Sequence, residues 1–178
     1  MTSFEDLLGY TSDTSVSDGV FTKCYSGLSS SHWERIKDAS LVLAEYGIGP
    51  PVLEIGEGNG EDNQHTNDNP DDVKTRCIHY QEVVPFVPFV PFVPFVPFEQ
   101  PPFGLSSDEI AFRISRLVDE MHDLGYAHGD LHLNNIGYDP KEKKIYLLDH
   151  DTVYSIHDDK PPLWLEKWMR EGFEWVGT

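Results

Sequence analysis

Five consecutive Val-Pro-Phe triplets occupy residues 84–98, and this repeat constrains the fold of the 178-residue chain more than any other feature. Proline fixes φ and lacks an amide donor, so a proline at every third position excludes an α-helix and a central β-strand. The period of three matches polyproline II, in which the run would span about 45 Å at ~3.1 Å per residue. Because five of the ten phenylalanines lie in the repeat, we expect the core to come from the flanking segments.

The repeat has two interpretations. In the first it is a surface linker, and residues 87–98 are then removable at little cost, because loop closure changes by only ~0.6 kcal/mol per doubling of length. In the second it is a docking strip, since a row of exposed phenylalanines forms a large apolar patch that a protein partner could cover. The linker is the simpler interpretation, and both stay open.

The charge balance narrows the class of protein. The chain has 13 Lys and Arg against 31 Asp and Glu, a formal net charge of −18, which disfavours binding to nucleic acid or to an anionic membrane. No apolar run approaches the ~18–20 residues of a membrane span, and the first residues lack the features of a signal peptide. Cys24 and Cys77 form no CxxC motif, so we expect two reduced thiols. These features predict a soluble cytoplasmic protein.

The segment before the repeat predicts strands around one helix. The helix has Ser31 as its N-cap and Glu34 three residues later, a capping box, and ends near Gly47. An acidic loop without Lys or Arg is expected over residues 56–72. The predicted strands are Leu7–Tyr10, Val20–Tyr25, Val52–Ile55 and Arg76–Val83, the first two joined by a turn-rich stretch, Thr11–Gly19.

The segment after the repeat predicts a long helix, a loop and a hairpin. The helix is capped by Ser106 or Ser107 and reaches Leu124, with apolar residues at helical spacing. The loop covers His128–Asn135, and the hairpin covers residues 136–148. A short Trp-rich helix is expected within Pro161–Phe173.

The strongest chemical signal lies in this second segment. The sequence His-Gly-Asp-Leu-His-Leu-Asn-Asn begins at His128, and Leu-Leu-Asp-His-Asp follows after the predicted hairpin. Asp130, Asn135 and Asp149 would therefore converge at one end of the hairpin. Phosphoryl transfer from a nucleotide needs such a set, because one carboxylate orients or deprotonates the acceptor hydroxyl while an amide and a second carboxylate hold Mg²⁺.

These two motifs resemble the catalytic and metal-binding loops of the protein-kinase-like superfamily. The form HGDLHxxNI is nearer to the aminoglycoside and choline phosphotransferases, and to small atypical kinases, than to the eukaryotic HRDLKxxN. The resemblance implies that Asp130 is the catalytic base, that Asn135 and Asp149 are the Mg²⁺ ligands, and that His128 anchors the loop. It also implies ATP and Mg²⁺ as cofactors.

The resemblance extends upstream. Lys23 occupies the place of the lysine that contacts the α- and β-phosphates, and Glu34 is the candidate for its ion-pair partner. Residues 80–84 would form the hinge that reads adenine, with Glu82 and Val84 as nucleotide-binding residues. The family's glycine-rich phosphate loop is missing, and the residues from Gly9 to Val16 would replace it.

The implied fold is α+β: a two-lobed protein-kinase-like domain with a small antiparallel sheet lobe and a mainly helical lobe. Residues 1–83 would form the N-lobe, 84–103 the linker, and 104–178 a truncated C-lobe. The implied function is an ATP- and Mg²⁺-dependent phosphotransferase that moves the γ-phosphate to a hydroxyl of a protein Ser or Thr or of a small molecule. The alternative is a catalytically weak, pseudokinase-like scaffold, which the short C-lobe, the missing glycines and the Val-Pro-Phe repeat favour.

Two other patterns suggest different chemistry. Residues 52–60 resemble the first motif of S-adenosylmethionine methyltransferases, but that fold needs a helix directly after the glycines, and an acidic, Asn-rich stretch follows instead. A zinc site built from His122, His128 and His132 is disfavoured because the first belongs to a helix and the second begins a loop.

Overall fold

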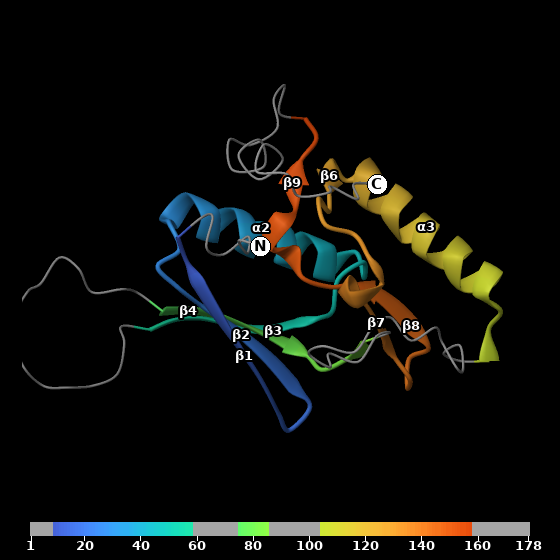
Figure 1. Ribbon diagram of the computed structural model, residues 1–178, viewed down its shortest axis with the longest axis horizontal. Coiled ribbons are helices and arrows are strands. Elements are labelled where there is room, and N and C mark those ends of the chain that lie inside the picture. The colour runs from blue at the N-terminus through green and yellow to red at the C-terminus, as the bar shows by residue number, and fades with distance from the viewer. Residues whose placement is uncertain (1–8, 59–74, 86–103, 158–178) are drawn as a thin grey trace, which may run out of the picture.

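The structure is a computed structural model that describes residues 9–58, 75–85 and 104–157 (Figure 1). These residues form a mixed α and β structure with antiparallel sheets, as predicted. The helices are α2 (Ser30–Glu45) and α3 (Ser107–Asp123), and short 3-10 turns are η2 (Leu133–Asn135) and η3 (His150–Thr152). The strands are β1 (Thr11–Ser17), β2 (Val20–Ser26), β3 (Val52–Gly58), β4 (Thr75–Gln81), β5 (Val84–Pro85), β6 (Tyr126–Ala127), β7 (Ile136–Asp139), β8 (Lys144–Leu147) and β9 (Tyr154–Ser155).

A four-stranded antiparallel sheet has the order β1-β2-β4-β3. Its first strand corrects a prediction, because Thr11–Ser17 is a strand and not a turn-rich stretch, and Tyr10 precedes it. Ser17 pairs with Val20, so Asp18 and Gly19 form a two-residue hairpin loop, and both have positive φ. An Asp-Gly pair between strands favours this tight turn, and it is the signal that identifies β1.

A disulfide joins the two central strands of this sheet. Cys24 of β2 lies directly opposite Cys77 of β4, with the Cα atoms 4.1 Å apart and the two sulfurs bonded. The prediction of two reduced thiols is therefore wrong. The pair is 53 residues apart in sequence, and only the register of β2 against β4 brings the two side chains together.

The two helices predicted within the described residues form, with one difference in capping. The N-cap of α3 is Ser106, one of the two predicted candidates, and its side chain accepts a hydrogen bond from the Glu109 amide. The N-cap of α2 is Ser29, which accepts from the His32 amide, so the expected capping box of Ser31 and Glu34 is wrong. Glu34 instead pairs with Lys37 one turn later.

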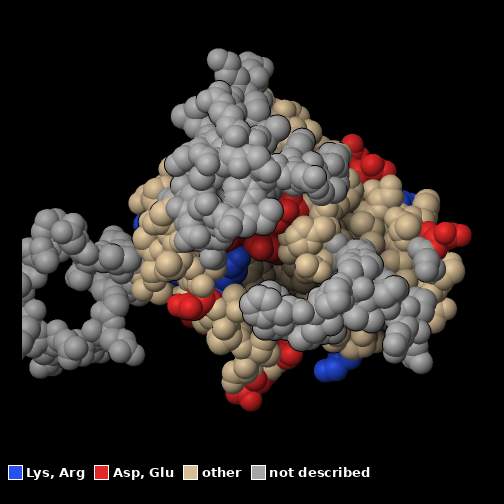
Figure 2. All heavy atoms as spheres, viewed as in Figure 1, with Lys and Arg blue, Asp and Glu red and all other residues tan. Residues whose placement is uncertain are grey.

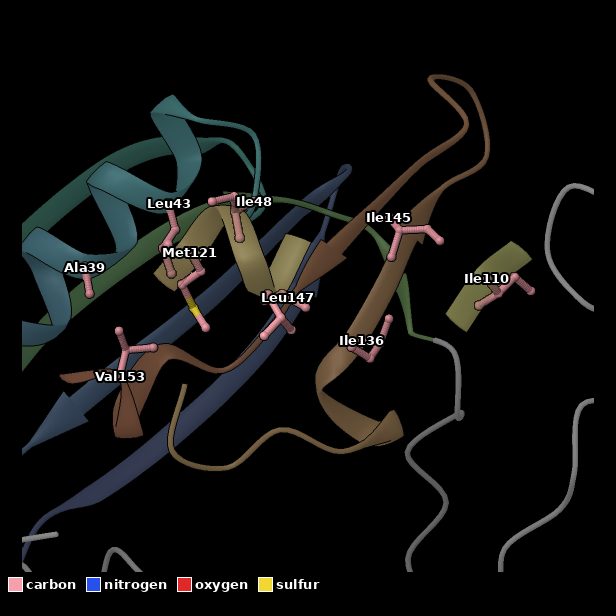
Figure 3. Packing of buried hydrophobic residues seen from close by; sticks show 10 residues of the cluster. Ala39, Leu43, Ile48, Ile110, Met121, Ile136, Ile145, Leu147 and Val153 are labelled. Carbon is pink, nitrogen blue, oxygen red and sulfur yellow. The ribbon is translucent and has the colours of Figure 1, made fainter. Parts of the chain in front are cut away.

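The apolar core consists of two clusters. One lies under the four-stranded sheet and includes Tyr25, Trp33, Ile36 and Ile78. The other joins α2, α3 and the β7–β8 hairpin, where Leu43, Met121 and Leu147 point toward one another (Figure 3). Helix α2 contributes to both clusters and also packs against η3, so it connects the sheet to the loops that follow the hairpin.

The start of the repeat forms part of a second, three-stranded sheet. Val84 and Pro85 make up β5, which pairs with β7 at the edge of the order β5-β7-β8. An edge position is where a strand tolerates proline. The rest of the repeat, the acidic loop from residue 59 and the predicted C-terminal helix lie outside the described residues. Within the described ranges, no helix is both long enough and apolar enough to cross a membrane.

Candidate functional site

The loop between α3 and β7 brings Asp130 and Asn135 together. The Asn135 side-chain amide donates to the Asp130 backbone carbonyl at 2.8 Å and lies 3.4 Å from the Asp130 carboxylate. Asn135 is the last residue of the 3-10 turn η2, and it lies five residues after Asp130. The amide nitrogen of Asn135 thus faces Asp130.

His132 lies in the same loop, beside both residues. Its Nε2 is 3.4 Å from the Asp130 carboxylate, and its Nδ1 accepts from the Asn134 amide. The hydrogen bond to Asp130 raises the pKa of His132, although partial burial opposes this shift. Sequence reasoning assigned His132 no role at this site.

Three hydrogen bonds tie this loop to the segment that carries Asp149. His128 is fully buried, and its Nε2 donates to the Leu148 carbonyl at 2.7 Å. The Leu148 amide donates to the Asn135 carbonyl at 2.7 Å, and the Thr152 hydroxyl donates to the His128 carbonyl at 2.6 Å. The residues on both sides of Asp149 are therefore held against the loop of Asp130, and His128 anchors the two segments as expected.

Gly129 allows the close approach of these two segments. Its φ is +78°, and a Cβ placed there would lie 2.6 Å from the Thr152 carbonyl oxygen. A side chain at this position would meet backbone as well as adopt a left-handed conformation, which L-residues other than glycine rarely do.

Lys23 reaches this site from β2. Its Nζ contacts the Asp149 carboxylate at 2.9 Å and the Asp151 carboxylate at 2.8 Å. The two contacts cross 126 and 128 residues of sequence. Near the centre of the face in Figure 2, acidic and basic side chains adjoin.

The charges of this group depend on one another. Burial by itself would lower the pKa of Lys23, but the two carboxylates outweigh it and raise that pKa above its usual range. Partial burial likewise opposes ionisation of Asp149, yet Lys23 holds the pKa of that carboxyl well below its usual value. The pKa of Asp151 is raised by burial and by the neighbouring Asp149 charge, against the opposing effect of Lys23.

Two tyrosine hydroxyls also bind Asp151. The Tyr25 hydroxyl donates to one carboxylate oxygen at 2.6 Å, and the Tyr10 hydroxyl donates to the other at 3.0 Å. Both tyrosines are buried. Sequence reasoning missed them, although Tyr25 lies two residues after Lys23 in the same strand, and side chains two residues apart share a face of a sheet.

Glu34 is not the ion-pair partner of Lys23, so that prediction is wrong. Its side chain is 55% exposed and pairs with Lys37 on the surface of α2. The buried side chains of α2 are Trp33, Ile36, Ala39, Ser40 and Leu43. Glu34 follows directly after Trp33 and lies on the exposed side of the helix.

The two expected hinge residues, Glu82 and Val84, contact other parts of the structure. The Glu82 amide donates to the Gly19 carbonyl at 2.9 Å, which ties it to the β1–β2 turn. Val84 is in β5 opposite Tyr138, and its side chain is exposed. The structure does not bring Glu82 or Val84 into contact with Lys23, Asp130 or Asp149 through any hydrogen bond among the described residues.

A buried chain of hydrogen bonds connects α2 to the turn that carries Asp149 and Asp151. Ser40 of α2 hydrogen-bonds both the Tyr80 hydroxyl at 2.9 Å and His150 Nδ1 at 3.1 Å, while His150 Nε2 donates to the Leu147 carbonyl at 3.0 Å. Burial, helped by the nearby His128, lowers the pKa of His150 to about 4. His150 thus stays neutral near pH 7 and fixes the turn that carries Asp149 and Asp151.

The donor set suits a hard cation better than zinc. Asp149 is 44% exposed, and no hydrogen bond among the described residues uses Asn135 Oδ1. One carboxylate oxygen and one amide oxygen could therefore bind a cation. Such a pair fits Mg²⁺, which protein sites hold with few protein ligands plus phosphate and water. Across residues 9–58, 75–85 and 104–157, no group of three or more His, Cys, Asp or Glu side chains could hold a metal ion.

Comparison with known proteins gives a likeness among solved structures. No protein-family model matches the sequence, and no curated protein is significantly similar to it. Among solved structures, the chain is similar to the kinase PK-1 of Cydia pomonella granulovirus, with 12% sequence identity and a TM-score of 0.48. The match covers 82% of this chain and 52% of that one, so the chain spans about half the length of PK-1.

Proposed function

We propose that this chain is an ATP- and Mg²⁺-dependent phosphotransferase with a two-lobed, protein-kinase-like fold. The observation that carries the proposal is the convergence of Lys23 from β2 with Asp149, beside a loop in which Asp130 and Asn135 are already joined. A cation for phosphates, a base and a pair of oxygen ligands are the groups that phosphoryl transfer requires.

Each group has a role that its surroundings support. The Lys23 ammonium stays charged between two carboxylates, as an anchor for the nucleotide phosphates needs to be. Asp130 is about one-third exposed and oriented by Asn135 and His132, so its carboxylate can accept a proton from a hydroxyl that arrives from solvent. These positions favour transfer to an alcohol acceptor on a protein or a small molecule.

Asn135 and Asp149 would hold Mg²⁺. The ion would neutralise charge on the phosphates and orient them for attack. Asp149 suits this role because its side chain is 44% exposed and because Lys23 keeps its carboxylate ionised.

Nucleotide binding is tested by thermal shift with ATP in the presence and absence of Mg²⁺. Ligand at 100 times its Kd stabilises a protein by ~2.7 kcal/mol, so the wild type should show a clear, Mg²⁺-dependent rise in Tm. Asp149→Asn should lose the Mg²⁺ dependence, because a neutral amide balances the cation poorly. A matched control is Asp119→Asn, an exposed residue of α3, which should behave as wild type.

Catalysis is tested by ADP release with a panel of alcohol acceptors. Asp130→Asn keeps the shape of the side chain but removes the charge that accepts the proton, and general-base assistance is worth ~10²–10⁴ in rate. Turnover should fall by about that factor while ATP binding is retained. Equal turnover in wild type and Asp130→Asn would refute the role of Asp130, and ATP binding without turnover on any acceptor would favour the scaffold.

A further inference from the structure

The two carboxylates that contact Lys23 differ in their surroundings. Asp149 is 44% exposed, and its only side-chain hydrogen bond in the described part of the chain comes from Lys23. Asp151 is 6% exposed and receives three side-chain donors: Lys23, Tyr10 and Tyr25. A carboxylate whose two oxygens are both occupied in this way has little room for a cation, whereas Asp149 faces solvent.

We propose that Asp151 is the positioning residue for Lys23, and that it holds the lysine in the phosphate site without a carboxylate from α2. The inference rests on the proposed function in one respect, which is that Lys23 contacts nucleotide phosphates. Asp149 is then left to bind the cation, and Asp151 keeps Lys23 in place when it does.

The tyrosines give this arrangement its rigidity. Tyr25 is fully buried and packs against Trp33 of α2, and its ring also lies 5.3 Å from Lys23 Nζ. Tyr10 packs against Tyr25 with ring centroids 6.1 Å apart. Because each hydroxyl binds a different oxygen of Asp151, the carboxylate plane is fixed, and with it the direction in which Lys23 is held.

The segment around η3, and not the exposed face of α2, supplies the carboxylates that hold Lys23. A lysine paired with a helix carboxylate depends on where that helix lies, but Glu34 of α2 is exposed and occupied by Lys37. In this chain the buried partner of Lys23, Asp151, comes from η3, and its second partner, Asp149, is the residue directly before η3. The lysine and the cation site are therefore coupled to one another and not to the position of Glu34.

The first experiment needs no nucleotide. A double-mutant cycle on urea unfolding combines Lys23→Met with Asp151→Asn, and the matched cycle combines Lys23→Met with Glu34→Gln. Residues in one charge network show strong non-additivity, and separate residues do not. We expect the Lys23–Asp151 coupling to change the unfolding equilibrium constant by at least about tenfold and the Lys23–Glu34 coupling by less than about twofold. The reverse order would overturn the proposal.

The second experiment separates positioning from a purely structural role by comparing ATP with adenosine. Asp151→Asn should weaken ATP binding at least about tenfold, which corresponds to 1.4 kcal/mol, because Lys23 is then no longer held in place for the phosphates. Adenosine has no phosphates, so its binding should stay within about twofold. In the Lys23→Met background, Asp151→Asn should cause no further loss of ATP affinity. Equal losses for ATP and adenosine would contradict positioning.

Two milder variants cover the case in which Asp151→Asn does not fold. Tyr25→Phe and Tyr10→Phe each remove one donor to Asp151 and keep the ring, and each should weaken ATP binding more than adenosine binding. No such difference in either variant would contradict the proposal. If the wild type binds no ATP, the proposed function fails, and the nucleotide-free cycle still decides whether Asp151 holds Lys23.

Discussion

Acidification should destabilise the protein through His150. The ring is buried, and its Nε2 faces the Leu147 carbonyl, which can only accept, so Nε2 carries the proton and Nδ1 accepts from Ser40. A second proton on Nδ1 would remove that acceptor and place a charge in the core. Burial of the ring, and after it the nearby His128, lower the pKa of His150 from 6.5 to about 4.

The direction and size of this change in the free energy of unfolding follow from proton linkage. Between pH 6.5 and about 4 the unfolded state binds a proton at this position and the folded state does not, so stability falls as the pH falls. At 1.36 kcal/mol per pH unit, the loss at pH 5 relative to pH 7 is ~2 kcal/mol from this side chain. Stability from the neutral ring is fully present above pH 6.5.

The assay is urea unfolding at pH 7 and pH 5 for the wild type and for His150→Gln. Glutamine does not titrate, so the pH-dependent loss should be smaller in the variant by ~2 kcal/mol, whatever its stability at pH 7. The control is His157→Gln, which removes an exposed histidine and should keep the wild-type pH dependence. The same pH-dependent loss in wild type and His150→Gln would refute the reasoning.

Three further outcomes are expected. Gly129→Ala should destabilise the protein by about 2 kcal/mol or more in urea unfolding, because the new Cβ meets the Thr152 carbonyl at a positive φ; a change near zero would contradict the close approach. Reducing the Cys24–Cys77 disulfide, which closes a 53-residue separation, should cost up to ~4 kcal/mol, and an unchanged Tm with dithiothreitol would count against it. Deleting residues 87–98 should leave Tm nearly unchanged if they are a linker, and a variant that unfolds would show that they belong to the core.

Local signals in the sequence determined much of the framework. A serine N-cap, predicted at Ser106 or Ser107 and found at Ser106, marks the start of α3, and turn residues between apolar runs mark the β7–β8 hairpin. Both depend on interactions within a few residues, which the order of side chains encodes directly. The loop of Asp130 and Asn135 belongs to the same class, because its two members are only five residues apart.

Only the tertiary structure decided which carboxylate holds Lys23. Glu34 forms an ion pair with Lys37 one turn away on the exposed face of α2. Asp151, in contrast, lies 128 residues after Lys23 in the chain. Such a contact depends on strand register and on the packing of η3 beneath the sheet. The local periodicity of the sequence predicts neither of them. Burial then favours the long-range partner, because a desolvated lysine needs opposite charge close by and an exposed pair is worth little in water.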